Sequence, residues 1–280
     1  MQKEDIKVCV LRIEGTNCED ETARAFKELG VNAEKVHLKQ LIKNPGISRE
    51  LHRNLFDYQV LMFPGGFSSG DYVRAGAILA ARIKKYLGSN LREFIRNGYA
   101  VGGICNGFQV MVELGILPAF DRVMSDVPDA SLSHNKSAKF ECRPTLLKSV
   151  DKCVFTQNLK ANEIFLIPCA HGEGRLTFAP EREREYLNYL EDNNQVIFRY
   201  AKPDGSLAEG EYPWNPNGSI SDIAGICNPE GNVMGMMPHP ERVMHPYLHH
   251  DWTRKPEILN KPGDGRAIFE SVIDYIKRIF

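Results

Sequence analysis

The feature that most constrains the fold of this chain is a cysteine between two glycines, at the point where an apolar strand is followed by a helix. A strand predicted over residues 99–104 runs into the segment Gly103-Ile104-Cys105-Asn106-Gly107, and a helical pattern follows it. In α/β enzymes a nucleophile sits on such a tight strand–turn–helix elbow, with glycines two residues before and after it. A Cβ at either glycine would clash with the adjacent strand or helix. The pattern therefore predicts that Cys105 is a nucleophile rather than an inert core thiol.

The predicted surroundings of Cys105 favour a reactive thiolate. The helix that follows places the positive end of its dipole at the sulfur. The backbone N–H of Asn106 is expected to point to the position where an oxyanion forms. A second glycine turn, Pro64-Gly65-Gly66, ends an apolar strand, and Gly66 is the candidate for the second oxyanion donor. Open α/β sheets bind ligands at the edge where both turns are expected.

Strands and helices alternate through the first half of the chain, which predicts βαβ units and a mainly parallel sheet. Strands are predicted over 8–11, 33–36, 60–63 and 99–104, and helices over 20–29, 77–86 and 91–96. In the second half, strands predicted over 139–147, 164–170, 195–200 and 223–227 are separated mostly by loops, which indicates antiparallel additions.

A strand over 233–237 and an amphipathic helix over 265–280 complete the predicted pattern, and turn residues mark loops over 212–218 and 246–263. We expect an α/β fold of three layers, with helices on both faces of the sheet. A single domain over residues 1–280 is the simplest organisation, because the chain shows no repeat and no low-complexity linker.

Composition excludes several classes of protein. The 280 residues carry 35 Lys plus Arg and 36 Asp plus Glu, so there is no basic excess of the kind that nucleic-acid binding requires. The polar start lacks the apolar core of a signal peptide, and no apolar run is long enough for a membrane span. Seven cysteines without a CxxC pair indicate reduced thiols and a cytoplasmic location.

A cysteine nucleophile needs a base, and the base needs an orienting group. The segment Pro238-His239-Pro240-Glu241 follows a predicted strand and offers both. In an extended segment, residues i and i+2 point to the same side, so His239 and Glu241 are expected to face one region. The chain order of Cys105, His239 and Glu241 disfavours an α/β-hydrolase, in which the acid precedes the histidine.

Other histidines of the chain compete for the same role. His171 also follows a predicted strand, and we place it on the substrate side rather than in the catalytic set. His245, His249 and His250 form a cluster that resembles a zinc site only loosely, because Pro246 interrupts it and no fourth ligand is evident. We interpret that cluster as a solvated loop.

Taken together, the motifs resemble those of a known family. The residues PGG from Pro64, GICNGFQ from Gly103 and PHPE from Pro238 resemble the class I glutamine amidotransferases. Further segments are similar to the glutaminase subunits of phosphoribosylformylglycinamidine synthases: LRIEGTN from Leu11, GFSSGDYVRAG from Gly66, FECR from Phe140, AHGEGR from Ala170, and the stretch 217–242. Ser69 departs from the tyrosine usual in that family, and extra residues lie near 78–90 and 247–261.

The resemblance implies a flavodoxin-like fold and a reaction. The Cys105 thiolate attacks the side-chain amide of glutamine, a thioester forms, and ammonia leaves for an ATP-dependent synthetase subunit of purine biosynthesis. A small third subunit is expected in the same complex. By position, Gly66 and Asn106 match the oxyanion donors, and Gln109 matches a residue of the glutamine pocket. No cofactor or metal is expected in this chain, and ATP and Mg²⁺ are expected on the synthetase.

Three other functions remain open at this point. The first is an amidotransferase that serves another acceptor. The triad resembles that of such enzymes equally well, because the glutaminase half does not contact the acceptor. A peptidase-like cysteine hydrolase shares the elbow, although there a histidine commonly follows the cysteine, and here Asn106 does. A non-catalytic interaction subunit that kept the fold is the third possibility, and the intact triad argues against it.

Overall fold

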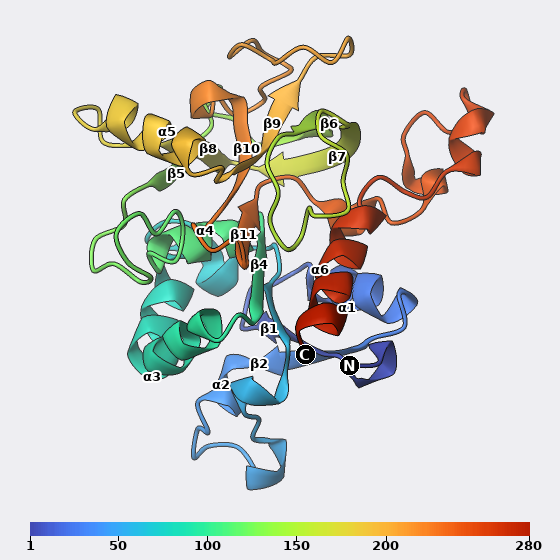
Figure 1. The fold of residues 1–280 in the computed structure, drawn as a ribbon. Helices are drawn as coiled ribbons and strands as arrows, with labels where there is room; N and C mark the ends of the chain where they lie inside the picture. The colour runs from blue at the N-terminus through green and yellow to red at the C-terminus, as the bar shows by residue number, and fades with distance from the viewer.

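The computed structural model describes all 280 residues, and its centre is a nine-stranded mixed sheet with helices on both faces (Figure 1). The strand order is β2-β1-β3-β4-β11-β10-β9-β6-β7, and β5 pairs with β8 in a separate two-stranded sheet. The strands are β1 Lys7–Arg12, β2 Asn32–His37, β3 Val60–Phe63, β4 Ala100–Ile104, β5 Ser131–His134, β6 Glu141–Ser149, β7 Ile164–His171, β8 Glu173–Thr177, β9 Val196–Ala201, β10 Ile223–Cys227 and β11 Val233–Met236.

The sheet consists of a parallel half and an antiparallel half. Strands β2, β1, β3, β4 and β11 pair in parallel. Strands β10, β9, β6 and β7 are added in antiparallel pairings beyond β11. The expected three-layer α/β fold with antiparallel additions is confirmed. Because β1, β3, β4 and β11 are parallel neighbours, the loops that follow their carboxyl ends meet at one edge of the sheet.

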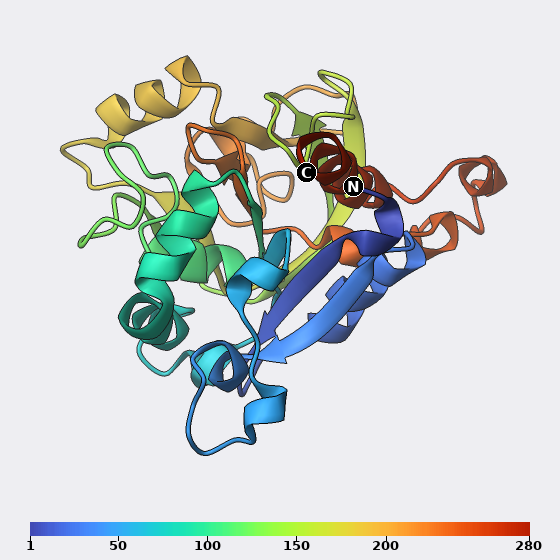
Figure 2. The same ribbon diagram turned by 60° about the horizontal axis from the view of Figure 1, so that its bottom comes forward.

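Helices cover both faces of this sheet. Helices α1 and α6 lie together on one side, and α3 and α4 lie on the other (Figures 1 and 2). One apolar cluster runs from Ile6 in the first loop to Ile276 in the last helix, which supports the single domain that we expect. The helices are α1 Glu19–Glu28, α2 Leu38–Leu41, α3 Ala77–Arg96, α4 Asn106–Glu113, α5 Glu183–Asp192 and α6 Arg266–Ile279.

The strand and helix patterns have simple physical causes. The segment VCVL of β1 is buried on both faces, as expected for a central strand between helical layers. In α6 the apolar side chains at helical spacing face the core, and the most buried are Ile268, Phe269, Val272, Ile273 and Ile276. The predicted strands and the final helix are therefore confirmed, although β6 begins two residues later than expected.

The prediction of two helices over 77–96 was wrong, because α3 is one continuous helix. Gly88 is buried, and a Cβ there would come within 3.3 Å of the sulfur of Met124. Apolar burial along the whole length of α3 outweighs the modest helix propensity of glycine. The extra residues near 78–90 thus lengthen a helix.

Several elements were not predicted. Helix α5 has a highly charged sequence and buries only Tyr186 and Leu190, so its apolar stripe is weak. Strands β5 and β8 are short and pair only with each other. The loop before α6, Pro246 to Gly263, projects from the body in both views (Figures 1 and 2) and contains two 3-10 helices, each begun by a proline.

The remaining 3-10 helices are Lys3–Asp5, Arg49–Leu51, Leu55–Asp57, Ser68–Asp71, Ile220–Asp222 and Pro240–Arg242. The two chain termini lie near each other beside α6 (Figures 1 and 2). Among the helices, none combines the length and the apolar character needed to cross a membrane.

Candidate active site

Cys105 occupies a strained elbow between β4 and α4. Its φ of 53° lies in the left-handed region, which residues other than glycine rarely adopt. The backbone N–H of Cys105 donates to the carbonyl of Met236 in the neighbouring strand β11 at 2.8 Å, and α4 begins at the next residue. The elbow thus directs the Cys105 side chain out of the sheet edge, with its sulfur beside the first turn of a helix.

Both flanking glycines are required by packing, as the sequence predicted. A Cβ on Gly107 would overlap the carbonyl oxygen of Phe63 at the end of β3. A Cβ on Gly103 would overlap the sulfur of Met111 in α4. The strand end and the helix can approach this closely only because neither glycine carries a side chain.

His239 and Glu241 form a buried ion pair next to this elbow. The Nδ1 atom of His239 lies 2.6 Å from Oε1 of Glu241, and the two side chains are 2% and 0% exposed. The backbone N–H of His239 donates to the carbonyl of Pro168 in β7 at 2.8 Å, which fixes the segment against the sheet. The expectation of an extended segment was wrong, because Pro240–Arg242 is a 3-10 helix. Its tight turn still brings Glu241 back to His239.

The electrostatic balance at His239 favours its charged form. Burial lowers the pKa of the imidazole, but the carboxylate of Glu241 and the sulfurs of Cys105 and Cys18 raise it, and the net result is a pKa well above the usual value. Because Nδ1 faces Glu241, Nε2 is the nitrogen left to exchange a proton, and it has no hydrogen-bond partner. The thiol of Cys105 donates to the carbonyl oxygen of Ala170 at 3.5 Å.

The glycine turn after β3 packs against both catalytic candidates. A Cβ on Gly65 would lie 2.8 Å from Cε1 of His239 and 3.4 Å from Cβ of Cys105. Gly66 has a φ of 140° and bridges to Thr16, and a side chain there would meet the backbone of Asn17. The structure therefore brings Gly66 and the start of α4 to the same corner as Cys105.

The side chain of Asn106 connects the elbow to the loop after Gly66. Its Oδ1 accepts from the N–H of Ser68 at 3.1 Å, and its Nδ2 donates to Asp71 at 3.2 Å and to Oε1 of Gln109 at 2.9 Å. The pKa of Asp71 is raised, and the largest cause is the burial of its carboxyl group. These hydrogen bonds tie the loop to the start of α4. The backbone N–H of Asn106 has no intrahelical acceptor, because Asn106 is the first residue of α4.

The two proposed substrate contacts, Gln109 and His171, are both buried near the triad. The amide of Gln109 already donates to the carbonyl of Glu173 and accepts from Asn106. Burial, with the charge on His239 as a smaller cause, lowers the pKa of His171 to about 3. Nδ1 of His171 lies 3.1 Å from Oδ1 of Asn135, and its Nε2 is unpartnered. An imidazole with so low a pKa is a poor proton acceptor, so His171 is unsuited to act as the base.

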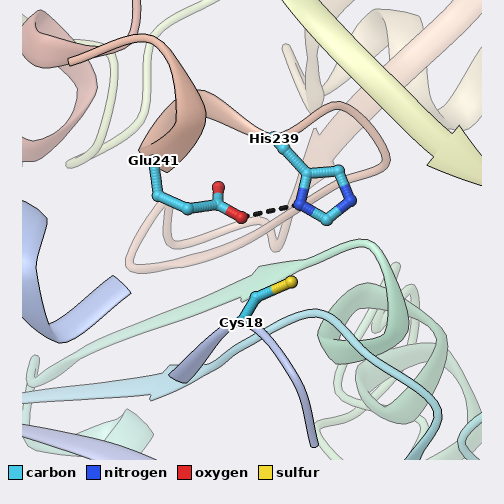
Figure 3. A group of neighbouring side chains, drawn as sticks. All are labelled: Cys18, His239 and Glu241. Carbon is cyan, nitrogen blue, oxygen red and sulfur yellow. Dashed lines mark hydrogen bonds and ion pairs between the residues drawn. The ribbon is translucent and has the colours of Figure 1, made fainter. Parts of the chain in front are cut away.

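One residue next to the triad was missed by the sequence interpretation. Cys18 directly precedes α1, at the end of the loop that follows β1, and its side chain points to the His239–Glu241 pair (Figure 3). Arg242 donates to its sulfur at 3.3 Å. The sequence does hold a signal for this position, because Cys18 follows a central strand of the parallel sheet and therefore lies at the ligand-binding edge. Only the strand order, with β1 beside β3, reveals the contact.

The histidine cluster of the projecting loop does not assemble into one site. His245 pairs with Glu28 at 2.8 Å, and the rings of His249 and His250 stack on each other with centroids 4.9 Å apart. The group of three potential metal ligands that the structure does bring together is Cys18, His239 and Glu241.

The catalytic candidates are covered in the isolated chain. Cys105 is 5%, His239 1% and Glu241 5% exposed. The main surface cavities are lined by other residues. Access of a substrate to the sulfur is therefore restricted. The loop over residues 67–73, which hydrogen-bonds to Asn106 next to the nucleophile, carries exposed side chains such as Tyr72, 88% exposed.

Comparison with known proteins places this geometry in a family. A model of the CobB/CobQ-like glutamine amidotransferase domain matches residues 5–276. The chain is 51% identical to phosphoribosylformylglycinamidine synthase subunit PurQ of Archaeoglobus fulgidus, over the full length of both. It is 38% identical to the PurQ subunit of Methanococcus maripaludis, over 97% of this chain and 98% of the relative. A chain in the structure of PurLQS from Thermotoga maritima superimposes with a TM-score of 0.69 and 28% identity, covering 97% and 99% of the two chains.

Proposed function

The chain belongs to the CobB/CobQ-like glutamine amidotransferase domain family, and we propose on that premise how its own residues carry out the reaction. It is the glutaminase subunit of a phosphoribosylformylglycinamidine synthase, an enzyme of purine biosynthesis. Its chemistry is the hydrolysis of glutamine to glutamate and ammonia. We assign the catalytic roles to Cys105, His239 and Glu241.

One observation carries the assignment of these residues. The buried pair of His239 and Glu241, with 2.6 Å between Nδ1 and Oε1, lies against the same glycine turn as the Cys105 elbow. A strained cysteine, a histidine with one free nitrogen and a carboxylate that orients it are the three parts of a cysteine triad. These parts come from the ends of β4 and β11, which are adjacent parallel strands.

The first half of the reaction forms a thioester. The Nε2 atom of His239 takes the proton of Cys105, and the Glu241 carboxylate stabilises the resulting imidazolium. The thiolate attacks the side-chain carbonyl carbon of glutamine, and the developing oxyanion accepts from the backbone N–H groups of Gly66 and Asn106. The imidazolium then gives its proton to the leaving nitrogen, so that ammonia departs and the acyl group remains on sulfur.

The second half regenerates the thiol. His239, now neutral, accepts a proton from water as the water attacks the thioester carbon, and the same oxyanion donors serve again. Collapse of the intermediate breaks the carbon–sulfur bond and releases glutamate, while His239 returns the proton to Cys105. In this scheme Gln109 and neutral His171 contact the glutamine, once Gln109 exchanges a hydrogen bond within the protein for one to the substrate.

Ammonia is the product that the rest of the complex needs. The relative from Thermotoga maritima is part of an assembly of PurL, PurQ and PurS. We infer that this chain passes its ammonia to an ATP-dependent synthetase subunit that forms formylglycinamidine ribonucleotide, and that a small third subunit takes part. ATP and Mg²⁺ belong to the synthetase in this scheme, and the chain itself needs no cofactor. Seven free cysteines support a cytoplasmic location.

Replacement of the nucleophile tests the proposal. Cys105→Ala should reduce glutamate release to background in the complex, while the circular dichroism spectrum and the melting temperature stay close to those of the wild type. Cys142→Ala is the matched control, because Cys142 is the exposed cysteine of the chain and should be dispensable. The glutamine analogue 6-diazo-5-oxo-L-norleucine should add covalently to Cys105, as judged by peptide mass mapping. Full activity of Cys105→Ala would exclude the mechanism.

A further inference from the structure

Cys18 gives the triad a neighbour that the glutaminase mechanism does not use. One ligand atom each of Cys18, His239 and Glu241 lies within 4.8 Å of the other two (Figure 3). All three residues are at most 5% exposed. They come from separate segments of the chain, the loop after β1 and the loop after β11, so their meeting is a property of the fold.

Two atoms of this group have no partner within the protein. Both Nε2 of His239 and Oε2 of Glu241 are buried and make no hydrogen bond. Buried polar atoms are almost always satisfied, so each such atom calls for a ligand or a role. The catalytic scheme uses Nε2 for proton transfer and leaves Oε2 of Glu241 and the sulfur of Cys18 unexplained.

We propose that Cys18, His239 and Glu241 form an inhibitory binding site for a zinc-like divalent cation. Sulfur, imidazole nitrogen and carboxylate oxygen are the three ligand types of zinc in proteins. Magnesium and calcium prefer oxygen ligands alone, so the sulfur selects against them. The neighbouring ligands of tetrahedral zinc lie about 3.5 Å apart, so ligand atoms that lie within 4.8 Å of one another have to shift by about 1 Å. Nδ1 of His239 and Oε1 of Glu241, which are 2.6 Å apart, have to separate by a similar amount.

The cation would occupy the place of two existing interactions. It would replace the proton shared by His239 and Glu241, and it would displace the guanidinium of Arg242 from the sulfur of Cys18. Arg242 is only partly buried, so its side chain has room to move. With three protein ligands, the fourth coordination position falls to water or to the sulfur of Cys105. A bound cation removes the base and its orienting carboxylate from catalysis, so glutamine hydrolysis stops.

Metal binding to a chain without the Cys105 thiol tests this site independently of the nucleophile. In the Cys105→Ala chain, no catalytic thiol is present, and Cys18 is the sole thiolate within the group of ligands. Cobalt(II), a spectroscopic substitute for zinc, should bind one ion per chain and give the near-ultraviolet absorption band of a thiolate–cobalt bond. Zinc should displace it and should raise the melting temperature.

The control variants decide whether Cys18 holds the ion. The double variant Cys105→Ala, Cys18→Ser should lose the thiolate band and bind zinc at least about tenfold more weakly. Cys105→Ala, Cys142→Ser should behave like Cys105→Ala, because the exposed Cys142 is not one of the three residues that the structure brings together as ligands. Circular dichroism shows that each variant is folded. Equal zinc affinity with and without Cys18, or no binding to Cys105→Ala at all, would overturn the proposal without affecting the glutaminase assignment.

Discussion

The sharpest test of the triad is the substitution Glu241→Gln. The amide has almost the same shape as the carboxylate but carries no charge, so the buried 2.6 Å contact with His239 loses its ionic character. If the amide presents its NH₂ group to Nδ1, the imidazole has to carry its proton on Nε2. The base is then in the wrong tautomer to accept a proton from Cys105. If the amide presents its oxygen, the imidazolium loses the opposite charge that stabilises it.

The expected loss follows from the burial of the pair. Both side chains are nearly inaccessible, so water cannot replace the missing charge. Breaking a buried ion pair costs about 3–5 kcal/mol. At about 1.4 kcal/mol for each factor of ten in rate, glutamine hydrolysis should slow by about 10²–10⁴-fold. The pKa of His239 should fall, because burial continues to lower it while the largest opposing cause is gone.

The assay is the rate of glutamate release by the complex at saturating glutamine. The melting temperature should fall as well, because the same buried ion pair stabilises the fold, so the rate is measured at a temperature where circular dichroism shows the variant to be folded. Glu257→Gln, which removes one carboxylate from the exposed projecting loop, is the matched control and should leave the rate unchanged. A Glu241→Gln protein that folds normally and keeps more than about a third of the wild-type rate would refute the role assigned to Glu241.

Three further predictions follow from the geometry. Gly107→Ala should lower both the melting temperature and the glutaminase rate, because its Cβ would overlap the carbonyl of Phe63; unchanged values in thermal melts and kinetics would show that the elbow tolerates a side chain. His171→Gln should weaken the acid sensitivity of the fold. The folded pKa of His171, about 3, lies below the unfolded value, so its contribution to stability is present above pH 6.5 and is lost as the pH falls toward 3. Between pH 7 and pH 4 that loss is about 3 kcal/mol and should be missing from the variant in urea unfolding curves, whereas parallel pH profiles would contradict it. Asn106→Ala should release the loop held by Ser68 and Asp71 and raise the rate of proteolysis there, and an unchanged digestion pattern would argue against that tether.

The central residues could be predicted from the sequence because their signals are local. The elbow around Cys105 is marked by two glycines whose necessity is a matter of steric overlap within a few residues. His239 and Glu241 are two positions apart, so any turn that brings them together keeps them near each other. The prediction of their pairing therefore survived even though the backbone there is a 3-10 helix rather than extended.

The features that were missed depend on tertiary packing. Cys18 is 221 positions from His239 in the chain, and only the placement of β1 beside β3 brings it to the pair. The continuity of α3 through Gly88 depends on apolar burial against its neighbours, which outweighs local propensity. The occupied hydrogen bonds of Gln109 likewise follow from the position of Glu173 in strand β8, which is distant in the sequence.

The most direct test of the central claim is glutamate release from glutamine by the purified chain, alone and with its ATP-dependent synthetase and small third subunit. ATP, Mg²⁺ and formylglycinamide ribonucleotide are supplied, and the thiols are kept reduced. Because Cys105, His239 and Glu241 are covered in the isolated chain, release should be weak alone and should rise strongly in the complete mixture. Absence of glutamate in every mixture would contradict the glutaminase assignment, and strong release by the chain alone would contradict the coupling to its partners.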